Sequence, residues 1–198
     1  MKFYLIRHAE TEWNVAKKLQ GWGDGALTEN GIEQSRLLGK RLTGMKFGKI
    51  YCSSSGRTRR TLDIALGSVN AIYLDSLREI SLGKWEGRLQ SEISAENPEQ
   101  FENFWHHPEK FSSDGGEDFY KLFERVGDSI REIAGKENDD FIVISHTAAI
   151  RAAVSSLQNK GVSSVWDGDY LKPTSVTCFE YSGGKFNLIY FGDASHLE

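Results

Sequence analysis

The chain has 198 residues, of which 39% are hydrophobic and 26% are charged. These values are ordinary for a globular protein, and the length suits one domain with a proper core. The net charge of −4 argues against a general nucleic-acid or membrane-surface binder. We therefore expect a single domain over residues 1–198, with no nucleic-acid partner and no membrane partner.

No N-terminal apolar segment resembles a signal peptide, and no apolar run approaches the length of a transmembrane helix. The cytoplasm is therefore the expected compartment. The two cysteines, Cys52 and Cys178, form no CxxC pair and lie near no histidine at zinc spacing. Neither cysteine predicts a metal site.

Apolar runs that predict strands alternate along the chain with amphipathic runs that predict helices. A first strand at 2–6 is followed by a polar, glycine-rich loop at 20–27 and by a helix that begins after Thr28 and ends near Leu42. The later elements are a strand at 50–52, a helix capped by 53–55 and ending near 66, a strand at 71–74, a helix at about 117–135, a strand at 141–145, a helix at 148–157, and a hairpin of 175–181 with 185–191. This order predicts an α/β fold, a three-layer α/β/α sandwich with a mostly parallel sheet and late antiparallel strands. The less regular stretch at about 77–119 is expected to form a cap or lid.

Charged and ionisable side chains follow four of the predicted strands. They are Arg7 and His8 after the first strand, Arg57 after the second, Glu79 after the third and His146 after the fourth. Ligands of open α/β sheets bind beyond the carboxyl ends of the strands. If the first and fourth strands are parallel neighbours, His8 and His146 point into one crevice. A single residue of this kind would be unremarkable, but four strand ends that carry one coherent chemistry predict a site.

That chemistry is phosphoryl transfer. Arg7 and Arg57 can each give forked hydrogen bonds to phosphate oxygens. An unperturbed imidazole has a pKa of about 6.5, so His8 or His146 can act as a neutral nucleophile and form a phosphohistidine. Glu79 is placed to protonate the leaving alkoxide and then to activate water.

The sequence offers no convincing metal or nucleotide site, and we expect no cofactor. Asp167-Gly168-Asp169 follows no apolar strand and is interpreted as a surface loop. The glycines at 21–25 lack the strand–loop–helix context of a dinucleotide site and any P-loop lysine.

Several motifs occur in an order that resembles the histidine phosphatase superfamily, the phosphoglycerate mutase-like proteins. The segment at 7–14, RHAETEWN, is similar to the signature R-H-G-E-T-x-W-N. The later matches are QGWGDGALT at 20–28, SSSGRT at 53–58, LREISLGKWEG at 77–87, GE at 116–117 and SH at 145–146. Each match alone is modest, whereas the ordered set covers nearly the whole chain.

The resemblance implies a role for each site residue. His8 would be the phosphorylated nucleophile and Glu79 the proton donor, while Arg7, Arg57 and His146 would bind the phosphoryl oxygens. Asn14, Gln20, Gly21 and the backbone N–H of Thr147 would complete the substrate-binding pocket. Ala9 and Thr147 stand where the family commonly has glycine, and neither change removes a charge.

Within the superfamily, the chain looks too short for the added segment of the mutases and resembles bacterial broad-specificity phosphatases. An α-ribazole phosphatase is the nearest alternative, and a mutase or a phospho-ligand binding protein without turnover remains open. We expect a small phosphate ester as the partner. The aromatic residues Trp22, Trp85, Trp105 and Phe111 could line the entrance or pack in the core, and His106 and His107 fit a solvated loop. The physiological ester and the oligomeric state are not predicted.

Overall fold

A six-stranded sheet organises the molecule, and the computed structural model describes all 198 residues. The strands are β1 (Lys2–Arg7), β2 (Ile50–Ser53), β3 (Ala71–Leu74), β4 (Phe141–Ser145), β5 (Val176–Ser182) and β6 (Lys185–Asp193), in the spatial order β3-β2-β4-β1-β5-β6. The strands β1 to β4 are parallel, whereas β5 pairs antiparallel to β1 and β6 antiparallel to β5. The predicted mostly parallel sheet with late antiparallel strands is confirmed.

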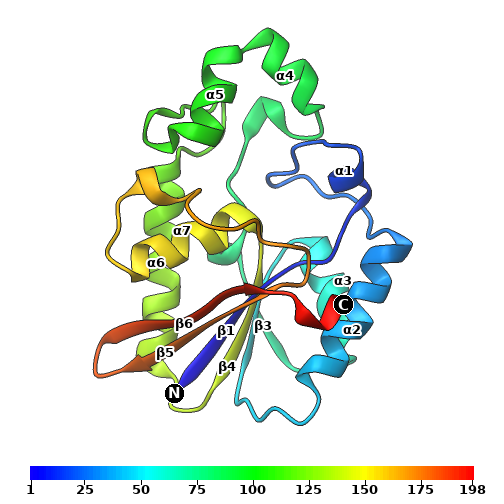
Figure 1. The fold of residues 1–198 in the computed structure, drawn as a ribbon, viewed down its shortest axis with the longest axis vertical. Coiled ribbons are helices and arrows are strands. Elements are labelled where there is room, and N and C mark those ends of the chain that lie inside the picture. The colour runs from blue at the N-terminus through cyan, green and yellow to red at the C-terminus, as the bar shows by residue number, and fades with distance from the viewer.

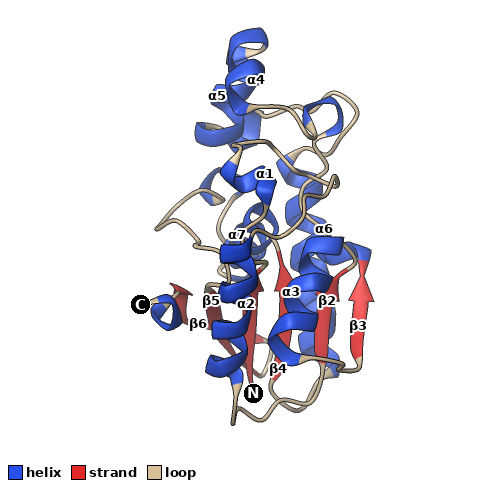
Figure 2. Ribbon diagram, turned by 90° about the vertical axis from the view of Figure 1, so that its right-hand side faces the viewer, coloured by secondary structure: helices blue, strands red, loops and turns tan.

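Helices cover both faces of this sheet, as the three-layer prediction requires. The larger helices are α2 (Glu29–Leu42), α3 (Gly56–Leu66), α6 (Phe119–Lys136) and α7 (Thr147–Leu157). Side chains alternate between the faces along β1. Tyr4 and Ile6 pack with Leu38 of α2 and Leu62 of α3, whereas Leu5 packs with α6 and α7 on the other face. Figure 2 shows α2 and α3 in front of the strands.

Residues 77–119 lie beyond the carboxyl ends of the strands, at the top of Figure 1. They contain two helices that the sequence did not suggest, α4 (Gln90–Glu96) and α5 (Pro98–His106). Pro98 begins α5 because a helix needs no N–H at its first position. Phe104 of α5 packs against Trp85 and against Phe119 at the start of α6, which anchors α5 to the body.

The loop that follows β1 contains the short helix α1 (Glu12–Val15). Thr11 caps it, and Asn14 completes a capping box with the Thr11 backbone. The loop is thus held rigid directly after the strand end. Polar side chains likewise follow the other parallel strands of the sheet.

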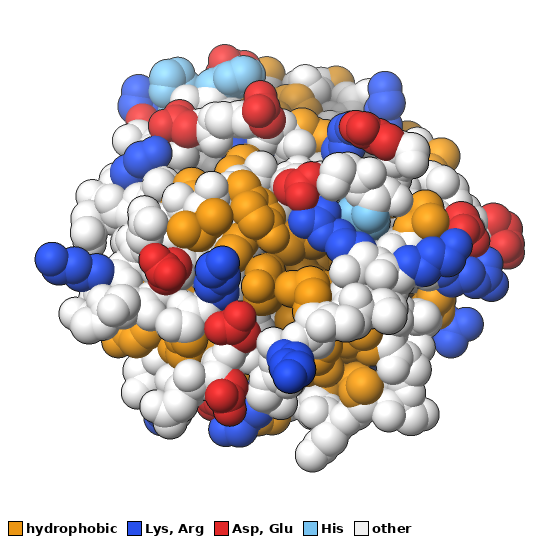
Figure 3. Space-filling model, turned by 60° about the horizontal axis from the view of Figure 1, so that its bottom comes forward, with side chains coloured by type: hydrophobic (Ala, Val, Ile, Leu, Met, Phe, Trp, Pro, Cys, Tyr) orange, Lys and Arg blue, Asp and Glu red, His pale blue; other side chains and the backbone are white.

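No helix has the length and apolar character needed to cross a bilayer. On the face seen in Figure 3, basic and acidic side chains are interspersed around a hydrophobic hollow. That face therefore carries no extended basic patch.

Candidate active site

His8 and His146 come together because β1 and β4 are adjacent and parallel, with Arg7 opposite Ser145 in the register. The two rings are buried and meet edge to face, with centroids 5.3 Å apart. His8 Nδ1 lies 2.7 Å from the Ala9 carbonyl oxygen, so this nitrogen donates and Nε2 carries the free lone pair. His146 Nε2 lies 2.8 Å from Ser53 Oγ, and its buried Nδ1 has no partner.

Burial lowers the pKa of His8 well below its usual range, and the charges of Arg57 and Arg7 lower it further. The pKa of His146 is also lowered well below its usual range, by burial and then by Arg57 and His8. Both shifts favour the neutral imidazole. A neutral His8 can therefore attack phosphorus without first losing a proton.

Two arginines flank His8 and turn the same edge toward the cavity. Arg7 Nη1 donates to Tyr170 Oη at 2.9 Å and to the Leu171 carbonyl, while its buried Nε has no partner. Arg57 is held in a comparable way by the loop that follows α1. Its Nη1 donates to the Gly23 carbonyl at 2.7 Å and to Asp24 at 2.9 Å, and its Nη2 donates to the Gly21 carbonyl at 2.9 Å. The Arg57 Nε is likewise buried and unpartnered.

Each guanidinium therefore keeps its Nε side free. The Nε groups of Arg78 and Arg151 are also buried without a partner, so what distinguishes Arg7 and Arg57 is that they line the same cavity as His8. The Nε–Nη2 edge of arginine presents two parallel N–H groups, which match two oxygens of a phosphate. The arrangement suits a phosphoryl group placed between Arg7, Arg57 and His8.

Glu79 lies at the N-terminus of α7. Its carboxylate accepts backbone N–H bonds from Ala149 at 2.9 Å, Ile80 at 3.0 Å and Ala148 at 3.1 Å. Thr147, the first residue of α7, has an N–H without an intrahelical partner, as helix geometry dictates. The helix end can thus serve both a carboxylate and a phosphate.

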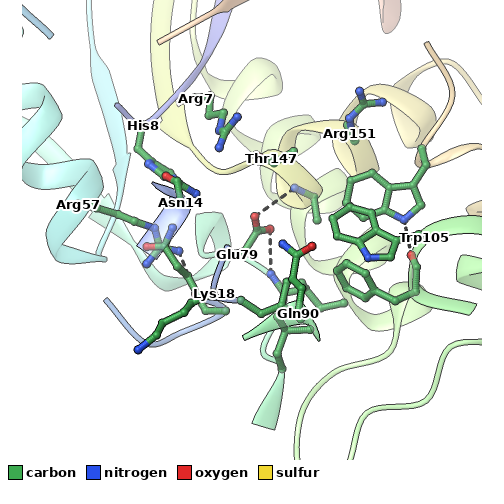
Figure 4. Close-up of a pocket in the computed structure, with 18 of the residues that line it drawn as sticks. Arg7, His8, Asn14, Lys18, Arg57, Glu79, Gln90, Trp105, Thr147 and Arg151 are labelled. Carbon is green, nitrogen blue, oxygen red and sulfur yellow. Dashed lines mark hydrogen bonds between the residues drawn. The ribbon is translucent and has the colours of Figure 1, made fainter. Parts of the chain in front are cut away.

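A cavity of about 270 Å³ joins these groups (Figure 4). Of the residues predicted for the site, Arg7, His8, Asn14, Gln20, Gly21, Arg57, Glu79 and Thr147 line it. His146 does not line it; its ring is fully buried and meets that of His8 edge to face. Figure 4 places Arg7, His8, Arg57 and Glu79 around the hollow, with Gln90 reaching toward Glu79 from the start of α4.

Sequence reasoning missed much of the outer wall. The apolar part consists of Leu19, Ile80, Leu82, Phe104, Trp105, Ala148 and Trp166, and the polar part of Lys18, Gln90, Arg151 and Tyr170. Arg151 could have been found, because it lies four residues after Thr147 on the same helix. Tyr170 and Trp166 lie in an irregular segment and gave no periodic signal.

The four aromatic residues proposed for the entrance divide between three environments. Trp105 lines the cavity. Trp85 and Phe111 are buried and pack against each other with centroids 5.4 Å apart, so for these two the core interpretation is correct. The Trp22 indole stacks on Arg78 and donates to the Glu79 carbonyl at 2.9 Å, outside the cavity wall.

No group of three or more His, Cys, Asp and Glu side chains is placed to hold a metal ion. The carbonyl oxygens of Asp167 and Asp169 both accept hydrogen bonds from Arg151. The Asp-Gly-Asp sequence is therefore part of a loop, and the Arg151 side chain of α7 binds the backbone carbonyls of that loop.

The geometry agrees with a comparison to known families. The model of the histidine phosphatase superfamily, branch 1, matches residues 3–194. The chain belongs to this superfamily, and it is a phosphatase. Phosphoserine phosphatase 1 of Hydrogenobacter thermophilus is 34% identical over 169 residues, which cover 84% of this chain and 80% of the relative.

Two further relatives of this phosphatase bear on its fold and its specificity. The solved structure of Bacillus stearothermophilus YhfR superposes with a TM-score of 0.94 at 36% identity, covering 100% of this chain and 99% of that one. The adenosylcobalamin/alpha-ribazole phosphatase of Salmonella typhimurium is 28% identical over 171 residues, which cover 84% of both chains. The family and the phosphoglycerate mutase-like fold expected from the motifs are thus confirmed.

Proposed function

We propose that this phosphatase hydrolyses small phosphate monoesters without a metal, through a phosphohistidine formed on Nε2 of His8. The observation that carries the proposal is the free His8 Nε2 between two unpartnered arginine Nε groups, with Glu79 across the cavity. In this arrangement the substrate phosphate supplies the missing acceptors. The arginines stabilise the charge on the equatorial oxygens while the bond from phosphorus to His8 forms and the bond to the ester oxygen breaks.

In the first step, the His8 lone pair attacks phosphorus and the bond to the ester oxygen breaks. Glu79 gives its proton to that oxygen, so an alcohol leaves and not an alkoxide. This step requires that Glu79 carries the proton when the ester is bound. In the second step, Glu79 takes a proton from water, the hydroxide attacks phosphorus, and the bond between phosphorus and His8 breaks to release phosphate.

The remaining predicted residues are assigned supporting roles. Asn14, Gln20, Gly21 and the Thr147 N–H would complete the phosphate pocket, since all four line the cavity. His146 would bind a phosphoryl oxygen through Nδ1, the one polar atom of its ring without a hydrogen-bond partner.

We further propose that residues 77–119 act as a cap that shapes the space for the leaving group. From this segment Phe104, Trp105 and Gln90 face the cavity. Aromatic surface favours planar or apolar leaving groups over a second phosphate. Aryl phosphates should therefore be better substrates than 2,3-bisphosphoglycerate, and equal or better turnover of the bisphosphate would contradict this part of the proposal.

An α-ribazole-5′-phosphate phosphatase is the second candidate, because a planar base and a ribose fit an aromatic wall. A panel that contains α-ribazole-5′-phosphate, phosphoserine, 3-phosphoglycerate and aryl phosphates separates the substrates. With 3-phosphoglycerate, inorganic phosphate as the product supports a hydrolase, whereas 2-phosphoglycerate would indicate a mutase. Activity should survive chelators, and a large loss would contradict the metal-independent scheme.

The intermediate itself provides the direct test. Denaturing the enzyme during turnover of a radiolabelled ester should trap an acid-labile, base-stable phosphoenzyme. His8→Ala should abolish both the trapped label and turnover, while His106→Ala, at an exposed position outside the cavity, should retain both. Label and full activity in His8→Ala would refute the mechanism.

A further inference from the structure

Tyr170 stands over Arg7 at the mouth of the cavity. Its ring centroid lies 5.4 Å from the guanidinium carbon, and its hydroxyl accepts a hydrogen bond from Arg7 Nη1 at 2.9 Å. The side chain is 67% exposed, so no packing requirement explains its position. A tyrosine that projects into solvent and still contacts a buried arginine indicates a function at the cavity mouth.

The hydrogen bonds of Arg7 explain what this contact does. Nη1 has two hydrogens, and these go to the Tyr170 hydroxyl and to the Leu171 carbonyl. The segment at 170–171 therefore occupies one end of the guanidinium and turns the Nε–Nη2 edge toward His8. Because this edge is the one that can hold two phosphate oxygens, Tyr170 helps to fix the orientation of the phosphate fork.

The Tyr170 hydroxyl also has a hydrogen of its own. A phenol can accept one bond and donate another, and the acceptor position is already filled by Arg7. The hydroxyl contacts Arg7 at Nη1, whereas a phosphate on the Nε–Nη2 edge lies on the other side of the guanidinium, beyond hydrogen-bond reach of the phenol. Tyr170 therefore acts on the phosphate through Arg7.

Arg151 holds the loop that carries Tyr170. Its Nη1 donates to the Asp167 carbonyl at 2.8 Å, its Nη2 donates to the Asp169 carbonyl, and its guanidinium packs near the rings of Trp166 and Phe191. Arg151 is 5% exposed, and both of its hydrogen bonds go to backbone carbonyls and none to a carboxylate. A buried arginine that donates its hydrogen bonds to two carbonyls of a loop serves to position that loop.

We propose that Tyr170 is a positioning residue, which accepts from Arg7 Nη1 and so fixes the orientation of the Nε–Nη2 edge, and that Arg151 is the positioning residue for the loop of Tyr170. The inference rests on the proposed function only for the place of the phosphate beside Arg7. Tyr170 thus affects binding of the phosphoryl group through Arg7 and not binding of the alcohol.

Binding of inorganic phosphate tests this without turnover. Tyr170→Phe removes the hydroxyl and keeps the ring, so calorimetric titration should show about tenfold weaker binding, which corresponds to a hydrogen bond to a charged group. The kcat/KM values for phenyl phosphate and for phosphoserine should fall by the same factor. Tyr120→Phe, at an exposed position on α6, is the matched control and should bind phosphate as the wild type does.

A double-mutant cycle tests the positioning role of Arg151. If Arg151 acts through Tyr170, Arg151→Met should weaken phosphate binding in the wild type and change it little in the Tyr170→Phe background. Unchanged phosphate binding by Tyr170→Phe, losses that differ between the two esters, or independent effects in the cycle would overturn the proposal. Should phosphate bind in a Tyr170-dependent way while no ester is hydrolysed, the proposed function fails and this inference stands.

Discussion

Arg125 and Glu117 form a two-pronged ion pair at the start of α6, with Nε–Oε1 and Nη2–Oε2 distances of 2.8 Å and 2.6 Å. The other hydrogens of Arg125 are donated to the carbonyls of Ser76, Arg78 and Glu79. Glu117 in turn accepts from the Ser81 N–H at 3.0 Å. The pair thus fixes the backbone on both sides of the proposed proton donor Glu79, although neither partner lines the cavity.

Arg125→Lys should therefore lower kcat about 10- to 100-fold, because a small displacement of Glu79 misplaces the proton donor. Lysine keeps the charge and loses the fixed fork that reaches three carbonyls. Phosphate affinity should change little, since Arg7 and Arg57 are the proposed ligands of the anion. Steady-state kinetics and phosphate titration check both outcomes.

Lys121→Gln is the control for Arg125→Lys, because Lys121 lies on the same helix and its ammonium is exposed at 3.9 Å from Asp118. It should keep the wild-type kcat. If Arg125→Lys weakened phosphate binding as much as it lowered kcat, its role would be general folding of the site and not the placement of Glu79.

Glu79→Gln should slow turnover in proportion to how much help the leaving group needs. We expect about a 10²–10⁴-fold loss of kcat for alkyl phosphates. The loss should be much smaller for p-nitrophenyl phosphate, whose phenolate leaves without a proton. A plot of the loss against the leaving-group pKa measures this directly, and an equal loss for all esters would contradict the acid role of Glu79.

The lowered pKa values of His8 and His146 predict how stability depends on pH. Histidines of the unfolded chain titrate near about pH 6.5, so below that pH the unfolded state binds protons that the folded state excludes. The free energy of unfolding should therefore fall as the pH falls below about 6.5 toward the folded pKa values, with no contribution from these groups above it. The fraction of His8 that is neutral, and the activity that depends on it, should meanwhile stay constant below that pH.

Urea denaturation between about pH 7.5 and about pH 5 tests this linkage. His146→Gln should make the loss shallower by up to about 1.4 kcal/mol per pH unit, because one titrating group is removed. The exposed His106 serves as the comparison, since His106→Gln should leave the slope unchanged. Equal slopes for all three proteins would contradict the exclusion of protons from His146.

The sheet and the residues that meet at its carboxyl edge could be predicted from sequence, because both depend on local signals. Apolar runs mark β1 and β4, and the polar residues that follow them, such as His8 and His146, mark the carboxyl edge of the sheet. The outer wall could not be predicted in this way. Tyr170 meets Arg7 through a contact between residues 163 positions apart, and the loop between α7 and β5 has no periodicity to place it.

Helices α4 and α5 were missed for a related reason. They are short, at 7 and 9 residues, and isolated helices of this length are marginal, so they depend on tertiary packing such as that of Phe104 on Trp85. Tertiary packing likewise decides that Trp85 lies in the core and that Trp105 lines the cavity. Local patterns thus predict the catalytic edge, and the shape of the leaving-group space requires the folded structure.

Gly31 connects the stability of the fold to the nucleophile loop. It lies in the first turn of α2, where a Cβ would stand 2.1 Å from the Glu10 carbonyl oxygen, two residues after His8. The Thr28 N–H also donates to that carbonyl, so the loop cannot move away without losing the bond. Gly31→Ala should therefore cost about 1–3 kcal/mol of stability and lower kcat by shifting His8.

Gly135→Ala offers the opposite case, because nothing lies within 4 Å of its Cβ position on α6. It should stabilise the protein by about 0.5–1 kcal/mol through helix propensity and leave kcat unchanged. Chemical denaturation and kinetics of both variants separate close packing at the nucleophile loop from a general effect of alanine in helices, and a stable, fully active Gly31→Ala would show that the loop tolerates displacement.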